Sequence, residues 1–396
     1  MIIMDFGRHR VYLLGSFLHL LSSSLGAPTH ELTTAPLNAM NLVFEMPPRI
    51  HNLFPAANFN RNVSTTVWNT NIIEQGDFKE TQSTFQAMKN PSFIVYDSAF
   101  YDLILAPNST QPSQVETIFQ FPPAPSWAAR QVHDGTVYAP KCNCIFFAEL
   151  HVPKSGFSAD AMPWVWRATN LNTTAPTFEK VYPHPQLAVP NGAYYHSGSI
   201  FWAQEGNFTT PGGVVRMDPL TLETEVVLNN FFGHRFNLPN DIVVTEKSIA
   251  FFTDGYFGFD NFNDTLPPEL ANGVWRWNMN TGNMKMVAGA ASGMLFNPNG
   301  VALDAAGDTL YVTNRGQTSA DADGARTIYA WEVTSSGIRN GEVFAYVDAG
   351  FPDGIKLDED GRVYAGVTGG VNVFSAEGTL LEKIKVLEND IVVNIV

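Results

Sequence analysis

From about residue 90 onward, short apolar runs alternate with turn residues along the whole chain. The clearest copy has an acid in a bend, Pro352-Asp353-Gly354, followed by an apolar run at 355–357. An Asp-Gly turn at 360–361 then precedes a second apolar run at 362–366. Apolar runs bounded by Gly, Pro, Asn and Asp predict β-strands joined by hairpin turns. No long stretch of helical periodicity interrupts this pattern after residue 90, so the sequence predicts an all-β fold.

The same sequence motif occurs five times, at intervals of 49 to 59 residues. The Asp or Asn that opens each copy is Asp134, Asn191, Asn240, Asn299 or Asp353. A repeat of about 50 residues with four short strands per unit is typical of a β-propeller. Five blades can be delimited, over approximately 130–182, 187–228, 237–288, 297–347 and 351–386.

We expect a six-bladed propeller, because a sixth inner strand begins near residue 388 before the sequence ends at Val396. Closing a propeller protects its sheet edges. The apolar runs 93–96 and 103–105 are the candidates to complete the sixth blade, which is otherwise incomplete. Residues 27–91 are rich in Pro, Asn and Thr and predict an irregular leader, so residues 92–396 form the predicted catalytic propeller domain.

The first 26 residues have the pattern of a secretory signal peptide. A basic segment at 8–10 precedes an apolar run at 11–21 and small residues at 22–26. The apolar run is about half the ~20 residues needed to span a membrane. We therefore expect a secreted, extracellular protein. Five sequons agree with glycosylation of a secreted chain, at Asn62, Asn108, Asn172, Asn207 and Asn263.

The composition narrows the range of partners. The net charge of −15, with only 15% charged residues, argues against nucleic acid and anionic membrane surfaces as partners. We expect a monomer that acts on a small molecule. The two cysteines, Cys142 and Cys144, are too few for a structural zinc site, and a bridge across one residue is strained. They are either two small residues at a turn or a labile disulfide.

The repeated Asp or Asn points to metal chemistry. Inner strands of a propeller begin at one mouth of its central channel, so equivalent positions converge there. Two carboxylates and several amide oxygens, with no clustered Cys or His, suit a hard cation, Ca²⁺ or another divalent ion. The alternative is that each copy is only a turn, because Asn, Asp and Gly tolerate turn conformations. Asn191 in particular is either a turn residue or a substrate contact.

The chain resembles the senescence-marker-protein/gluconolactonase/luciferin-regenerating-enzyme-like family, particularly its secreted fungal lactonohydrolase-like branch. The motifs that carry the resemblance are at 237–241, 251–256, 297–300 and 352–354. The resemblance implies a six-bladed propeller with calcium held by Asn240, Asn299 and Asp353. The family normally has a Glu in the first blade, where this sequence has Asp134 as the fourth ligand.

On these grounds we expect a calcium-dependent lactonase. Asp353 is the expected general base and Asn240 the second catalytic residue, whereas His133 and His234 lie beside the motif turns and are candidate substrate contacts. Serine-nucleophile and zinc-protease motifs are absent from the sequence. The alternatives are a phosphotriesterase, a strictosidine-synthase-like enzyme, or a propeller that binds a ligand without catalysis.

Overall fold

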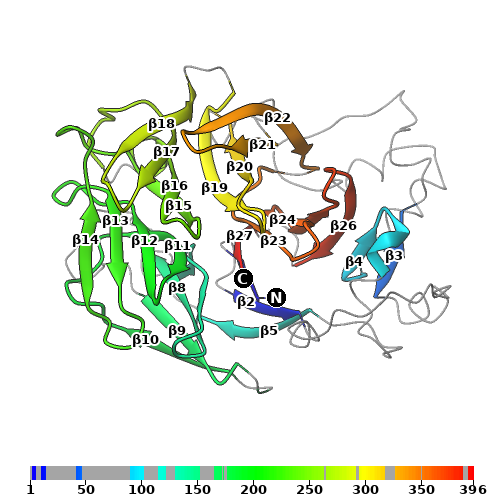
Figure 1. Cartoon of the computed structure of the whole chain (residues 1–396). Coiled ribbons are helices and arrows are strands. Elements are labelled where there is room, and N and C mark those ends of the chain that lie inside the picture. Colours follow the sequence, from blue (N-terminus) through cyan, green and yellow to red (C-terminus); the bar gives the residue numbers. More distant parts are fainter. Residues whose placement is uncertain are drawn as a thin grey trace.

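The computed structural model describes residues 2–5, 10–14, 42–46, 90–101, 115–121, 130–151, 165–171, 173, 176–262, 265–290, 294–316, 326–348, 350–386 and 391–396. The strands in these segments form six sheets. Figure 1 shows the sheets around a common centre, with the first strand of each blade nearer the centre and the last at the periphery. The prediction of an all-β propeller arrangement is confirmed.

Three blades have four antiparallel strands in chain order. The second blade contains β11 (Pro190–His196), β12 (Ser199–Gln204), β13 (Gly213–Met217) and β14 (Thr224–Leu228). The third contains β15 (Pro239–Val244), β16 (Ile249–Asp254), β17 (Gly273–Asn278) and β18 (Met284–Gly289). The fourth contains β19 (Asn297–Leu303), β20 (Thr309–Arg315), β21 (Thr327–Val333) and β22 (Ile338–Tyr346).

The first and fifth blades depart from this pattern. The first contains β6 (Arg130–Val132), β7 (Val137–Ala139), β8 (Cys144–His151), β9 (Val165–Thr169) and β10 (Thr177–Val181), with β6 and β7 both paired to β8. The fifth contains β23 (Ile355–Leu357), β24 (Val363–Val367), β25 (Gly370–Phe374) and β26 (Leu380–Lys385), extended by β4 (Phe93–Val95) and β3 (Val43–Glu45).

Burial explains why the middle strands read as continuous apolar runs. All five residues of β24 and all five of β25 are buried, because neighbouring blades cover both faces of each sheet. The outer strand β14 has no fully buried residue, in keeping with its peripheral place. The tight turns use glycine where the backbone is left-handed, as at Gly361, with a φ of 80°.

The sixth sheet combines the two ends of the chain. Its strand order is β27 (Val392–Ile395), β1 (Ile2–Asp5), β2 (Arg10–Leu14) and β5 (Val115–Gln120). The predicted signal peptide therefore overlaps β1 and β2. Export itself stays a prediction.

The expectation that residues 93–96 complete the sixth blade is wrong. Phe93–Val95 forms β4, which pairs with β26 at the edge of the fifth blade, and β3 lies parallel beside it. β26 presents unpaired backbone groups at its outer edge, and β4 satisfies them while burying Phe93 and Val95. The other candidate, 103–105, lies outside the described residues, as does most of the predicted leader.

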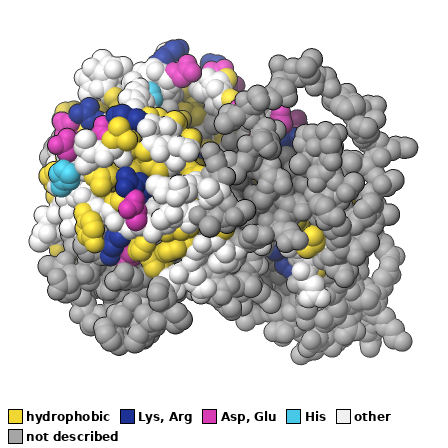
Figure 2. Space-filling view, turned by 90° about the horizontal axis from the view of Figure 1, so that it is seen from below, with side chains coloured by type: hydrophobic (Ala, Val, Ile, Leu, Met, Phe, Trp, Pro, Cys, Tyr) yellow, Lys and Arg dark blue, Asp and Glu magenta, His cyan; other side chains and the backbone are white. Residues whose placement is uncertain are grey.

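The chain also contains two short helical elements and a disulfide. A 3-10 turn, η4, spans Ser98–Phe100, and a short π-helix, η6, spans Gly258–Phe262. A disulfide joins Cys142 and Cys144, so the structure has the bridged form of the two alternatives. Among the described residues, no helix has the length and apolarity to span a membrane. Figure 2 shows basic, acidic and hydrophobic side chains interspersed on the described part of one face.

Candidate active site

Three of the five motif residues, Asn191, Asn240 and Asn299, lie in β-bulges at the start of the inner strands. The register of pairing shifts between Pro190 and Ala193 in β11, and equivalent shifts occur in β15, between Pro239 and Ile242, and in β19, between Pro298 and Val301. Each bulge contains the motif Asn and the residue after it. Bulges re-aim side chains and are frequent beside active sites. Each Asn therefore departs from the regular alternation of its strand.

Two buried threonines link the bulge of one blade to that of the next. Thr253 accepts a hydrogen bond from the backbone N–H of Asp241 at 3.0 Å and donates to the carbonyl of Asn299 at 2.5 Å. Thr313 accepts from the N–H of Gly300 at 2.7 Å and donates to the carbonyl of Asp353 at 2.8 Å. These hydroxyls fix the relative positions of the motifs in three successive blades.

The residue after each of these threonines holds the loop that precedes its motif. The Asp254 carboxylate accepts from the backbone N–H of Leu238 at 2.7 Å. Asn314 accepts from the N–H of Phe296 at 3.0 Å, and Gln204 plays the same part for Ala188 at 2.9 Å. In the sequence this support corresponds to a polar residue at or next to the end of the second strand in three blades, Gln204, Asp254 and Asn314.

Four of the five predicted residues are almost fully buried. Asp134, Asn191, Asn240 and Asn299 are 1% to 6% exposed, and Asp353 is partly buried. The side-chain oxygens of Asn191, Asn240 and Asn299 have no hydrogen-bond partner in the structure. A buried polar oxygen without a partner is unfavourable by about 1–3 kcal/mol, so three at one repeat position require a common explanation.

The carboxyl groups at the motif positions repel one another electrostatically. Burial, together with repulsion from Asp241 and Asp353, raises the pKa of Asp134 well above its usual value. Burial raises the pKa of Asp353 to about 7, against the opposing effects of Arg315 and of a hydrogen bond from Asn299. Burial also raises the pKa of Asp241. Each of these three carboxyl groups is therefore harder to ionise than a free aspartate.

This donor set fits a hard cation. The side chains supply carboxylate and amide oxygens, which Ca²⁺ prefers, and a cation would satisfy the partnerless amide oxygens and offset the repulsion among the carboxylates. No group of three or more His, Cys, Asp or Glu side chains with metal-binding geometry occurs within the described residues. Any cation here would therefore depend on the asparagines.

The two predicted histidines differ in their surroundings. His133 is buried beside Asp134 and hydrogen-bonds to the backbone of Pro190, and burial lowers its pKa to about 4, so it is neutral at neutral pH. The side chain of His234 is 61% exposed and lies 3.6 Å from Glu269. The structure thus brings His133 to the ring and leaves His234 on the surface at the side of the third blade.

Three further residues at the ring were not predicted. Asp241 follows Asn240 and accepts hydrogen bonds from the backbone of Ile242 and of Val301. Asn394, in the C-terminal strand, donates to Asp134. Arg315 acts on Asp353 electrostatically and lies 4.1 Å from the centre of the Phe351 ring. Asp241 was visible in the motif Asn-Asp, whereas only the fold reveals the other two.

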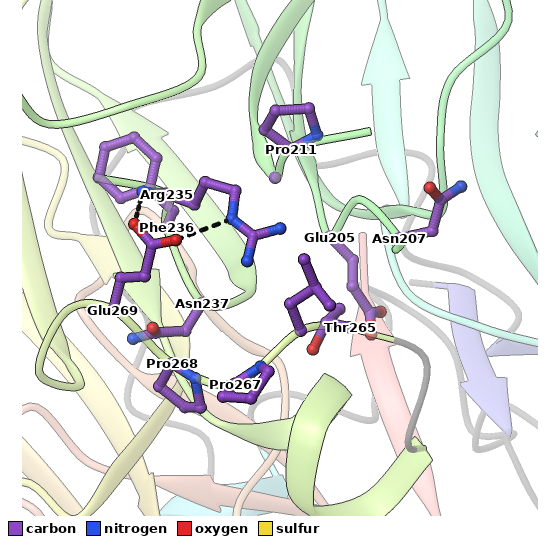
Figure 3. A pocket seen from close by; sticks show the side chains of 12 residues that line it. Glu205, Asn207, Pro211, Arg235, Phe236, Asn237, Thr265, Pro267, Pro268 and Glu269 are labelled. Atoms are coloured by element: carbon purple, nitrogen blue, oxygen red, sulfur yellow. Dashed lines mark hydrogen bonds and ion pairs between the residues drawn. The ribbon is translucent and has the colours of Figure 1, made fainter. Parts of the chain in front are cut away.

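A pocket opens between the second and third blades (Figure 3). It is small and partly open to solvent, and it lies between the segment 205–212 and the segment 265–269. Glu205, which is 1% exposed, and Thr265 stand on one side, and Arg235, held by Glu269 at 3.1 Å, stands on the other. Asn237 also lines this pocket, three residues before Asn240.

Four of the predicted glycosylation sites, Asn62, Asn108, Asn172 and Asn263, lie outside the described residues. Asn207 is described, at the edge of the pocket. Its side-chain oxygen accepts from the N–H groups of Thr209 and Thr210 at 2.9 Å.

The family model for the SMP-30/gluconolactonase/LRE-like region matches residues 165–395, more than half of the chain. The chain belongs to this family. The matched segment contains four of the five ring residues, Asn191, Asn240, Asn299 and Asp353, so the predicted resemblance is confirmed on the motifs that carried it.

Named relatives agree with this assignment. The chain is 27% identical to the lactonohydrolase oryL of Aspergillus oryzae over 339 residues, 80% of this chain and 72% of the relative. It is 29% identical to a gluconolactonase of Zymomonas mobilis over 194 residues, 46% of this chain and 50% of that protein. A solved gluconolactonase structure from Xanthomonas campestris superposes with a TM-score of 0.52 at 20% identity, covering 66% of this chain and 78% of the other, and so shows the shared fold.

Proposed function

We propose that this chain is a secreted, calcium-dependent lactonase that hydrolyses a sugar-derived or other small-molecule lactone. The observation that carries the proposal is the set of buried oxygen donors at one repeat position of five blades, with three partnerless amide oxygens among them. The enzyme class is confirmed by the relatives, which are a lactonohydrolase and a gluconolactonase by name. The calcium dependence and the kind of lactone are our proposal and are not given by the names of these relatives.

We assign the calcium ligands to Asp134, Asn240, Asn299 and Asp353. When bound, Ca²⁺ would act as a Lewis acid on the lactone carbonyl. The Asn191 oxygen, in the same ring and without a partner, is available to substrate. The bulges and the two linking threonines fix the donors of the third, fourth and fifth blades before substrate arrives, which limits the reorganisation needed during the reaction.

Asp353 is the proposed general base for the attacking water. Its carboxylate would combine this role with that of a metal ligand, because a bound cation favours the charged form. Asn240, whose side-chain oxygen has no hydrogen-bond partner, is the second proposed catalytic residue. Arg315, beside Asp353 and against the rings of Phe257 and Phe351, supplies a positive charge close to where the negative charge develops.

The pocket between the second and third blades is the proposed site for the substituents of the lactone ring. The Glu205 carboxylate and the side-chain oxygen of Asn237 can accept hydrogen bonds from hydroxyl groups, while Phe236, Leu266 and Pro267 provide an apolar wall. This combination favours a small, partly hydroxylated lactone over a long apolar chain.

We also propose that the sheet β27-β1-β2-β5 is the sixth blade. It joins the C-terminal strand to the fifth blade, because the N–H of Gly354 donates to the carbonyl of Val393 at 2.9 Å. Cleavage of the signal peptide near residue 26 would remove β1 and β2, so this sheet exists only in a chain that keeps residues 2–14.

The proposed activity is tested on purified protein with a panel from gluconolactone to pantolactone, beside a phosphotriester such as diisopropyl fluorophosphate. Hydrolysis of at least one lactone, with a slower reaction on the phosphotriester, supports the proposal. Hydrolysis of the phosphotriester alone would indicate that the protein is a phosphotriesterase. No turnover of either class by folded protein would favour a binding propeller.

A further inference from the structure

The C-terminal strand β27 reaches the ring between the motifs of the first and fifth blades. A Cβ atom at Gly354 would lie 2.4 Å from the carbonyl oxygen of Val393 and 2.9 Å from the Cα of Asn394. Only glycine leaves room for this approach, immediately after the ring residue Asp353. The strand is therefore seated directly against the proposed metal site.

The side chain of Asn394 uses both ends of its amide. It is 1% exposed, and its nitrogen donates to Oδ1 of Asp134, 260 residues away in the sequence. Its oxygen accepts from the backbone N–H of Ile395 at 2.7 Å. Because one end is fixed by its own strand, the other end has a defined position and direction.

Asp134 receives a second hydrogen bond on the same oxygen, from the N–H of Gly135 at 2.7 Å. Two donors on Oδ1 hold the carboxylate plane and leave Oδ2 for another partner. This matters at residue 134, since an aspartate is one methylene shorter than a glutamate and has less freedom to adjust its reach to a cation.

We propose that Asn394 is a positioning residue for the calcium ligand Asp134, so that the last strand of the chain tunes the metal site. The proposal rests on the proposed calcium site. Outer partners that orient a metal ligand typically change metal affinity on the order of 10- to 100-fold when removed. Asn394 acts through Asp134, the side chain to which its amide donates.

The test measures the dissociation constant of Ca²⁺ by isothermal titration calorimetry on full-length protein. We expect Asn394→Ala to weaken binding on the order of tenfold or more. Asn372→Ala is the matched control, because Asn372 is equally buried and donates to a different aspartate, Asp348, at 2.9 Å. The control loses a comparable hydrogen bond and should retain the affinity of the unaltered protein.

A double-mutant cycle separates positioning from a general loss of structure. In an Asp134→Ala background, Asn394→Ala should produce no further loss of calcium affinity, because its partner is absent. If Asn394→Ala does not fold by circular dichroism, Asn394→Ser replaces it in the cycle, with a weakened affinity expected there too.

The outcomes distinguish the two proposals. Unchanged calcium affinity in Asn394→Ala, or an equal loss in both backgrounds, overturns the role of Asn394 and leaves the calcium site intact. Absence of calcium binding by the unaltered, folded protein overturns both.

Discussion

Asp353 is partly buried and Asp254 is fully buried; the pKa of each is raised to about 7, yet they have different surroundings. Asp353 lies among ring residues and is opposed by Arg315, so its charge can be used in chemistry. Asp254 is buried behind the third motif and accepts hydrogen bonds from the segment before it. The same pKa therefore indicates a catalytic group in one case and a structural group in the other.

Replacing Asp353 with Asn should abolish most of the activity. The variant cannot accept the proton of water, and loss of a general base reduces kcat by about 10²- to 10⁴-fold. The measurement is kcat on the best lactone of the panel. Asp358→Asn, in the turn of the same blade, is the control and should retain activity. Near-normal kcat in Asp353→Asn would remove this residue from the mechanism.

The raised pKa of Asp254 predicts that the stability of the fold depends on pH. Its pKa is about 7 in the folded state and 3.8 in a model compound, so folding favours the protonated form. Its contribution is complete below about pH 4 and is lost as the pH rises through about 7, amounting to a few kcal/mol. The Tm of the unaltered protein should therefore fall, relative to that of Asp254→Asn, between about pH 4 and about pH 7. A constant difference in Tm would contradict this account.

At the scale of elements, the repeat was readable because each blade is built from local signals. The apolar runs, the turn glycines and the motif Asn or Asp lie within about 50 residues of one another, so their spacing predicted five blades and the residues of the ring. The place of β4 was not readable, since Phe93–Val95 is as apolar as an inner strand. Its pairing depends on β26, whose edge is exposed only after the fifth blade has formed.

Loops from the second and third blades together form the pocket. Glu205→Gln should raise KM for hydroxylated lactones about tenfold and leave kcat nearly unchanged, since a hydrogen bond to a charged group contributes about 1.5–3 kcal/mol. Glu225→Gln, on the exposed outer strand of the second blade, is the control. An equal rise in KM for an unsubstituted lactone would show that the pocket does not recognise hydroxyl groups.

At the scale of the whole molecule, the two ends of the chain meet beside the site. Neither this sheet nor the contact between Asn394 and Asp134 could be predicted, because residues 260 positions apart are brought together only by closure of the ring. The ligand set was predictable from one position per blade, whereas the groups that orient it come from neighbouring blades.

The position of the mature N-terminus shows whether residues 2–14 are removed on export or retained in the sheet with β27. Export predicts that the secreted protein begins near Ala27, without β1 and β2. N-terminal sequencing of protein recovered from the medium of a secreting host tests this. A secreted protein that retains residues 2–14 would favour their place in the sixth blade, as the structure has it.

The central claim is that a cation held by the ring is required for lactone hydrolysis. The most direct measurement is the rate of acid release in a pH-stat before treatment, after EDTA, and after calcium is restored in excess. We predict that activity disappears with the chelator and returns with calcium, while circular dichroism shows the same fold throughout. Full activity after EDTA, with calcium shown to be absent from the protein, would contradict the account.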